Sequence, residues 1–205
     1  LAVAFFLPLS LNVSSVFLAV AALLWLSKMA AERRVDFVRT PFDCFVAILV
    51  ILSAGSIFVS PDPGFSFYNY YHLMGRYVLL YYIVINNICT VGQLKRLVWV
   101  MLCSAFVVTV YGFYQYIHGV DVSAFQWVDG EQFPELKTRV YSTLKNPNLL
   151  AGFLVTMMAV AIGLCLKHAE FKGRLVLGLL VLAFGVCLMF TYSRGAWLSV
   201  LAVIG

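Results

Sequence analysis

The sequence predicts an all-α membrane protein, a polytopic transmembrane helical bundle of about six or seven spans. Of its 205 residues, 63% are hydrophobic and only 11% are charged, whereas soluble domains average about 45–50% apolar and about 25% charged residues. The mean hydropathy is +0.96. Apolar runs near the length of about 20 residues that a span needs recur along the chain. This composition excludes a soluble enzyme, a disordered chain and a disulfide-stapled secreted module.

The first half of the chain divides into helices at its turn signals. A turn over residues 8–12 separates the end of one helix from a second helix over about 13–29. Thr40 and Pro41 should begin the next helix, which runs to about residue 59, because Thr is a good N-cap and Pro suits the first helical position. Asp43 then favours the helix dipole. A turn over 60–64, rich in Pro and Gly, precedes a helix over about 65–88.

The second half of the chain likewise alternates between apolar helices and polar loops. A short loop with Lys95 and Arg96 should lead into a span over 97–117, followed by a long polar outer loop over 118–145. Spans over 149–166 and 175–192 follow, and the last helix starts at Gly195. Because both ends lie inside apolar runs, we expect a single membrane domain over 1–205 that is truncated at both ends. The first run has no charged leader or cleavage site typical of a signal peptide.

The basic residues orient the spans. One set of alternating loops holds nine Lys and Arg residues: Lys28, Arg33, Arg34, Arg39, Lys95, Arg96, Lys167, Lys172 and Arg174. The opposite set holds four: Lys137, Arg139, Lys145 and Arg194. The richer side is expected to be cytoplasmic, so the 118–145 loop should face outward. This pattern also explains the net charge of +5 without a nucleic-acid partner.

Arg76 stands out because it lies inside a predicted span. It follows the start of its helix by about eleven residues, near mid-membrane at about 1.5 Å per residue. Asn69, His72 and Arg76 have the spacing i, i+3, i+7, which places them on one helix face. An arginine at this depth needs a partner or an aqueous cavity. It is either tied to neighbouring carbonyls or to Asp62, or it forms a site for an anionic group.

The sequence Asn146-Pro147-Asn148 predicts a capped helix start. One interpretation is that these residues serve only as a helix cap. The other is an anion site, because the helix start leaves free backbone N–H groups beside Lys145 and Arg139, and helix N-termini with basic side chains bind anions. Arginine binds phosphate in a bidentate manner. A diphosphate at the membrane surface would suit this cluster.

Arg194 lies in the predicted outer turn between two spans. It is either part of an anion site or an interfacial arginine with Trp197 as its aromatic anchor. His118 and His168 are interpreted as surface residues. The four loop acids are interpreted as side chains of a solvated loop: Asp121, Asp129, Glu131 and Glu135. The five cysteines are interpreted as small buried hydrophobes. No motif predicts a metal, a nucleotide or another cofactor.

Three segments resemble the superfamily of O-antigen ligases and O-antigen polymerases of the bacterial cell envelope. They are Tyr111-Gly112-Phe113-Tyr114-Gln115-Tyr116, the run from Arg139 through Asn146-Pro147-Asn148 to Gly152, and Phe190-Thr191-Tyr192-Ser193-Arg194-Gly195-Ala196-Trp197-Leu198. The resemblance covers most of the chain in topology. Its motifs lie mainly between Tyr111 and Leu198.

This resemblance implies a glycosyltransferase of the bacterial inner membrane. Such enzymes move a glycan from an undecaprenyl-diphosphate carrier to a lipid or glycan acceptor on the outer face, without metal or nucleotide. Arg139 and Arg194 match the family arginines that hold the diphosphate, and a histidine in a later external loop serves the acceptor. We therefore expect Arg139 and Arg194 to be catalytic. From the residues alone, and not from the resemblance, Lys145, Asn146, Asn148, Arg76 and His72 are expected to bind substrate.

Two other classes of function stay open at this point. One is a transporter of a small anion such as bicarbonate, in which Arg76, Asn69 and His72 would line the path. Against it, the sequence has no inverted repeat and no pair of broken helices. The other is a membrane scaffold without catalysis, for which substitution of the arginines would have no effect on glycan transfer.

Overall fold

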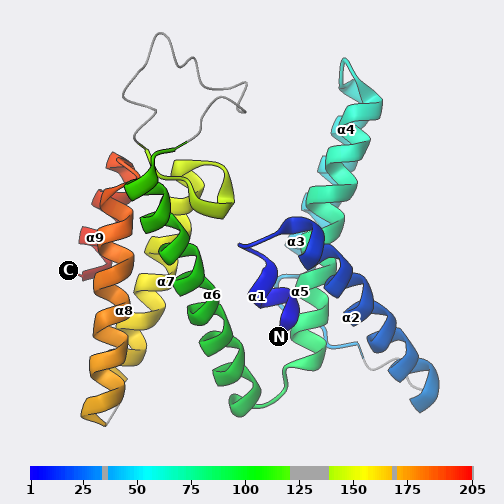
Figure 1. Cartoon of the computed structure of the whole chain (residues 1–205). Helices are drawn as coiled ribbons and strands as arrows, with labels where there is room; N and C mark the ends of the chain where they lie inside the picture. Colours follow the sequence, from blue (N-terminus) through cyan, green and yellow to red (C-terminus); the bar gives the residue numbers. More distant parts are fainter. Residues whose placement is uncertain (34–36, 121–138, 168–169, 205) are drawn as a thin grey trace. The chain divides into compact units, whose positions relative to one another are not determined.

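The computed structural model describes residues 1–33, 37–120, 139–167 and 170–204, and every regular element within these ranges is a helix (Figure 1). The chain forms two compact units. The first unit comprises Leu1–Leu11 with Leu97–Gly205, and the second comprises Asn12–Arg96. Each unit is described by itself. Two compact units are compatible with one membrane domain, so the single domain stays a prediction.

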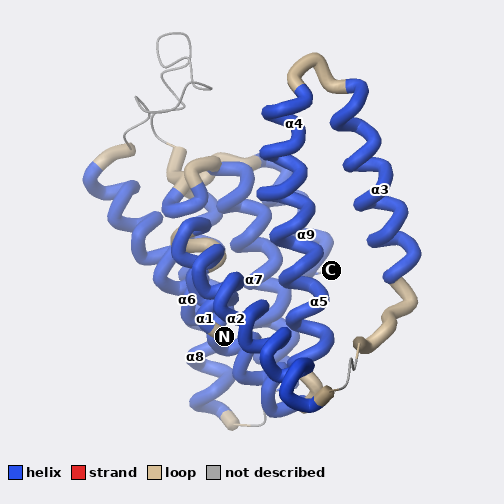
Figure 2. The backbone as a smooth tube through the Cα atoms, turned by 90° about the vertical axis from the view of Figure 1, so that its right-hand side faces the viewer, coloured by secondary structure: helices blue, strands red, loops and turns tan. Residues whose placement is uncertain are grey.

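The second unit contains α2 (Leu11–Glu32), α3 (Asp43–Val59) and one long helical segment. This segment joins α4 (Pro63–Asn69), a π-helical turn η1 (Tyr70–Gly75) and α5 (Arg76–Asn87). Figure 2 shows the loop that connects α3 to α4. The sequence predicts this helix from residue 65, but it begins at Pro63, because the carboxylate of Asp62 caps it by accepting the N–H of Phe65 at 3.0 Å.

The start of α3 differs from the predicted one. Helix α3 begins at Asp43 after Phe42, so Thr40 and Pro41 precede it. Instead of capping a helix, Thr40 donates its backbone N–H and its hydroxyl to the two carboxylate oxygens of Asp43, at 3.0 and 2.6 Å. Asp43 does lie in the first turn, as expected, where its charge favours the helix dipole.

The first unit contains α1 (Ala2–Phe6), most of α6 (Val91–His118), a 3₁₀ turn η3 (Ser142–Leu144), α7 (Pro147–Lys167), α8 (Phe171–Met189) and α9 (Arg194–Ile204). Helices α8 and α9 both pack on α7, and the contact between α7 and α8 is the more extensive of the two. The helical spans over 97–117, 149–166 and 175–192 are thus found with shifted ends.

Some of the basic residues predicted to lie in loops are part of the helices. Lys95 and Arg96 belong to α6, and Lys172 and Arg174 belong to α8. Helix α6 starts early because Thr90 and Gln93 form a capping box. The hydroxyl of Thr90 accepts the Gln93 N–H at 3.2 Å, and the Gln93 side chain accepts the Thr90 N–H at 3.1 Å. The spacing Thr-x-x-Gln was visible in the sequence and was missed.

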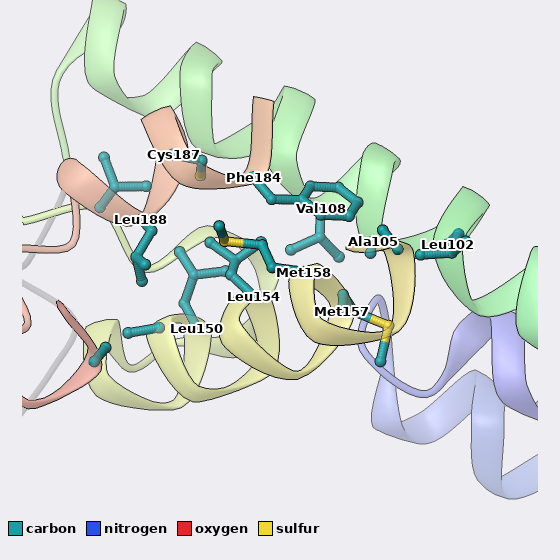
Figure 3. Close-up of a cluster of buried hydrophobic side chains, with 14 of the residues drawn as sticks. Leu102, Ala105, Val108, Leu150, Leu154, Met157, Met158, Phe184, Cys187 and Leu188 are labelled. Atoms are coloured by element: carbon teal, nitrogen blue, oxygen red, sulfur yellow. The ribbon is translucent and has the colours of Figure 1, made fainter. Parts of the chain in front are cut away.

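The core of the first unit lies between α6, α7 and α8 (Figure 3). Its fully buried side chains include Val108 of α6, Leu154 of α7 and Phe184 of α8. Near one end of this core, α6 approaches α8 closely at Gly112. A Cβ atom there would lie 2.8 Å from Sγ of Cys187 and 3.3 Å from Cγ1 of Val140, so the approach requires a glycine.

Four of the described helices, α2, α6, α7 and α8, are long and apolar enough to cross a membrane. Helix α3 is apolar but has only 17 residues. The protein is therefore an all-helical protein with the helices of a membrane protein, and the number of six or seven spans stays a prediction. Among the cysteines, Cys187 is buried as expected, whereas Cys44, Cys89 and Cys103 are exposed in the described structure.

Candidate anion-binding site

Three basic residues gather at one end of the first unit, which we call the arginine end. Here α6 ends at His118, α7 begins at Pro147, and a turn joins α8 to α9 (Figure 1, upper left). The residues of this end are Arg139, Lys145 and the segment from Asn146 to Asn148, together with the turn from Phe190 to Arg194.

The backbone that carries Arg139 is fixed by hydrogen bonds to two helices. The N–H of Val140 donates to the carbonyl of Phe190 at 3.0 Å. The side-chain oxygen of Gln115 accepts the N–H groups of Tyr141 and Ser142, at 3.3 and 2.7 Å. Gln115 is 6% exposed, so these bonds are shielded from water. The segment after Arg139 is therefore held between α6 and the end of α8.

The Ser142 side chain adds a further anchor. Its hydroxyl donates to the carbonyl of Val108 in α6 at 2.6 Å, and the residue is 2% exposed. One residue later, the hydroxyl of Thr143 donates to the carbonyl of Pro8 at 2.6 Å, which joins the segment to the turn after α1. Buried hydrogen bonds of this kind are costly to lose, because the groups left behind would lack both water and a partner.

Arg139 connects the start of α7 to the turn after α8. Its Nε donates to the carbonyl of Thr191 at 2.8 Å, and its Nη2 donates to Oδ1 of Asn148 at 2.9 Å. Two of the five N–H groups of the guanidinium are thus engaged within the described residues. Partial burial lowers the pKa of Arg139 below its ordinary value, because removal of water disfavours the charged form. An arginine nevertheless stays charged in proteins.

The predicted cap of α7 is confirmed. The side-chain oxygen of Asn146 accepts the N–H of Asn148 at 2.8 Å and, less closely, that of Leu149 at 3.4 Å. Pro147 occupies the first helical position. Asn148 thus uses its backbone in the cap and its side chain to hold Arg139. Lys145 is exposed next to this helix start.

Arg194 is the first residue of α9 and is exposed. The turn before it is tight. Thr191 is fully buried, its hydroxyl donates to the carbonyl of Leu188 at 2.7 Å, and the same oxygen accepts the N–H of Ser193 at 3.3 Å. Because the carbonyl of Thr191 also accepts from Arg139, one residue holds Arg139 and shapes the turn that presents Arg194.

The described residues of the first unit include one acidic side chain. It is Glu170, which caps α8 at the end opposite to the arginine end. The positive charges of Arg139, Lys145 and Arg194 therefore have no acidic neighbour within the described part of this unit, and their common field favours an anion. The loop acids Asp121, Asp129, Glu131 and Glu135 lie outside the described residues.

Backbone strain is concentrated at the same end. Ser142, Lys145 and Tyr192 adopt left-handed conformations, with φ of 51°, 59° and 51°. For residues with a side chain this conformation costs about 1 kcal/mol or more each, and such strain persists where the surrounding contacts enforce it. It accumulates at functional sites more often than elsewhere. The arginine end is thus built at a cost in stability.

Arg76 and His72 belong to the second unit, and the arginine end belongs to the first. Both line a pocket beside α2. Asn69, which the spacing i, i+3, i+7 placed on the same face, does not line this pocket, since the π-helical turn η1 changes the register between it and Arg76. His118 stacks on Tyr114 with ring centroids 4.2 Å apart, and His168 lies outside the described residues.

Of the residues that position Arg139, Asn148 was a candidate from the sequence, whereas Gln115 and Thr191 were not. Gln115 stood within a motif, but nothing in its position indicated that it bonds residues 26 and 27 positions later. Thr191 acts through its backbone carbonyl, for which no sequence signal exists. Within the described ranges, no group of three His, Cys, Asp or Glu side chains could hold a metal ion.

Comparison of the chain with models of protein families, with curated proteins and with solved structures gives no match.

Proposed function

We propose that this chain belongs to a glycosyltransferase of the bacterial inner membrane, which moves a glycan from an undecaprenyl-diphosphate-linked donor to a lipid or glycan acceptor on the outer face. The observation that carries the proposal is the geometry of Arg139. Two side-chain hydrogen bonds, to Thr191 and Asn148, connect its guanidinium to the start of α7 and to the turn before α9. Lys145 directly precedes the first of these, and Arg194 follows the second.

The chemistry of such a transfer requires positive charge at a fixed place. A hydroxyl of the acceptor attacks the anomeric carbon of the glycan, and the bond from this carbon to the diphosphate oxygen breaks. The leaving diphosphate carries the developing negative charge. Donors that are positioned in advance stabilise this charge more than mobile ones, because they need no reorganisation during the reaction. Arg139 has this property, and Arg194 supplies a second cation.

Asn146, Asn148 and Lys145 complete the proposed diphosphate site. The cap at Asn146 accepts the N–H groups of Asn148 and Leu149, so the free N–H groups expected at this helix start are already engaged. The start of α7 favours an anion through the helix dipole instead. Asn148 is a positioning residue for Arg139, because its oxygen accepts a guanidinium N–H. Lys145 adds a charge without a fixed geometry.

The orientation of the arginine end follows from the other end of the same helices. Lys167, Lys172 and Arg174 lie where α7 ends and α8 begins, which favours a cytoplasmic location there and an outward location for the arginine end. Aromatic rings cluster at the arginine end, as is typical of a membrane surface. Tyr116 stacks on Phe190 with centroids 3.7 Å apart, and Tyr111 stacks on Tyr114.

The test uses the full-length protein in a deletion strain. Arg139→Ala and Arg194→Ala should each abolish glycan transfer, so that surface polysaccharide is lost and carrier-linked glycan accumulates. Arg174→Ala is the matched control, since it removes an exposed arginine from the opposite end. All three variants should insert into the membrane at wild-type levels.

Two results would reject the proposal. Wild-type transfer by both arginine-end variants would leave the site without a role, as expected for a scaffold. Uptake of labelled bicarbonate into proteoliposomes that requires Arg76, together with unchanged surface polysaccharide in the deletion strain, would instead favour anion transport.

A further inference from the structure

The second unit contains a pocket that the proposed glycan transfer does not use. It has a volume of about 460 Å³ and lies between the first turns of α2 and the segment from η1 into α5. Its polar side chains are Asn12 and Ser15 from α2, Tyr71 and His72 from η1, and Arg76 from α5. Leu18, Ala19 and Leu79 form an apolar part of its wall.

The polar lining is suited to an anion. Arg76 is a permanent cation with a planar set of donors, and His72, Asn12 and Ser15 each carry a group able to donate a hydrogen bond. No acidic side chain is among the lining residues in the described part of the chain. Because the apolar wall continues from the polar lining, the ligand should have an anionic group joined to an alkyl portion.

None of the described acids of this unit lines the pocket: Glu32 ends α2, and the other two are engaged elsewhere. Asp43 binds Thr40 at the start of α3, and Asp62 caps α4 through the N–H of Phe65. Asp36 lies outside the described residues. The expected alternative, an ion pair between Arg76 and Asp62, is thus not formed in this structure: Asp62 caps the helix that Arg76 continues. The Arg76 cation therefore lines the pocket without an acidic side chain in its described lining, and a bound anion would supply the countercharge.

The π-helical turn η1 fixes how His72 and Arg76 enter the pocket. π-helical turns are rare and often mark functional sites. Here the turn ends directly before Arg76 and includes His72. The His72 ring packs on Tyr68, with centroids 4.1 Å apart, and edge-on against Tyr71 at 5.4 Å. These contacts hold the imidazole on the side of the helix that lines the pocket.

We propose that this pocket binds a phosphate group, with Arg76 and His72 as its principal ligands and with the wall at Leu18 and Leu79 packed against an attached alkyl chain. The phosphate could come from the headgroup of an anionic lipid or from free phosphate. The site is independent of Arg139 and of the proposed glycan transfer, because it lies wholly within the second unit.

The test measures binding by the purified full-length protein in neutral detergent. Thermal unfolding is followed during titration with phosphatidylglycerol, phosphatidylcholine or inorganic phosphate. Phosphatidylglycerol should raise the Tm in a saturable manner, and zwitterionic phosphatidylcholine should not. A shift with inorganic phosphate alone would support the same pocket chemistry and identify free phosphate as the source.

Variants locate the effect. Arg76→Gln should weaken the binding at least tenfold, whereas Arg96→Gln, which removes an exposed arginine of α6, should leave it unchanged. If Arg76→Gln does not fold, Ala19→Leu provides the test, since it fills the pocket without a change of charge. Absence of any shift with the wild-type protein, or equal binding by Arg76→Gln or by Ala19→Leu, would overturn the proposal.

Discussion

Substitution of Gly112 by alanine should destabilise the first unit by a clash that can be calculated from its geometry. The added Cβ would lie 2.8 Å from Sγ of Cys187 and 3.3 Å from Cγ1 of Val140. An ordinary contact begins near 3.4 Å, so α6 and α8 would have to separate by several tenths of an ångström. Overpacking of this kind typically costs about 1–3 kcal/mol.

The matched control is Gly152→Ala in α7, where an added Cβ meets no atom within 4 Å. Both substitutions replace a helical glycine and share the gain in helix propensity of up to about 1 kcal/mol. That gain cancels when the two variants are compared, so their free energies of unfolding should differ by the clash alone, about 1–3 kcal/mol. Equilibrium unfolding of the purified protein in mixed micelles measures this difference.

A second substitution tests the cause. Cys187→Ala removes the sulfur atom that the new Cβ would meet, and only the 3.3 Å contact with Val140 would remain. The loss in the double variant should therefore be smaller than the sum of the two single losses by about 1 kcal/mol or more. Equal stabilities of Gly112→Ala and Gly152→Ala, or strict additivity with Cys187→Ala, would refute the close approach of α6 to α8.

Two further predictions concern the arginine end and use the same unfolding measurement. Asn146→Ala should cost about 1 kcal/mol because α7 loses its cap, and Asn146→Asp should retain most of the stability; equal losses for both would argue against the cap. Gln115→Leu should cost about 2–4 kcal/mol because it leaves the N–H groups of Tyr141 and Ser142 buried without an acceptor. Gln115→Glu keeps an acceptor oxygen and should lose less stability. An unchanged free energy of unfolding for Gln115→Leu would contradict the assigned bonds.

The sequence was informative about several features whose structural cause is local. The apolar runs predicted α2 and α7, and the cap of α7 depends on residues within three positions of Asn146. Charges were a poorer guide to helix ends. Lys95 and Arg96 were expected in a loop, yet α6 includes them, because the capping box at Thr90 starts the helix before them. A charged residue is compatible with a helix end, so its presence does not mark a loop.

The parts of the site that could not be predicted depend on long-range contacts. Arg139 was identified as a candidate by its motif, but its geometry is set by a carbonyl 52 residues away. Any residue type carries such a carbonyl, so no pattern indicates it. The π-helical turn that removes Asn69 from the pocket depends likewise on a backbone hydrogen-bonding pattern, and spacing rules for an α-helix assume that this pattern is uniform.

The π-helical turn between α4 and α5 has a consequence for how the length of this chain can vary. A turn closed by i→i+5 bonds holds one residue more than the α-helical turn that would replace it. Deletion of a single residue within Tyr70–Gly75 can therefore be absorbed by conversion to an α-turn, with α4 and α5 keeping their neighbours. In an uninterrupted helix such as α7, the same deletion would rotate every later side chain by about 100°. Related sequences that differ by one residue should therefore place the gap in this turn.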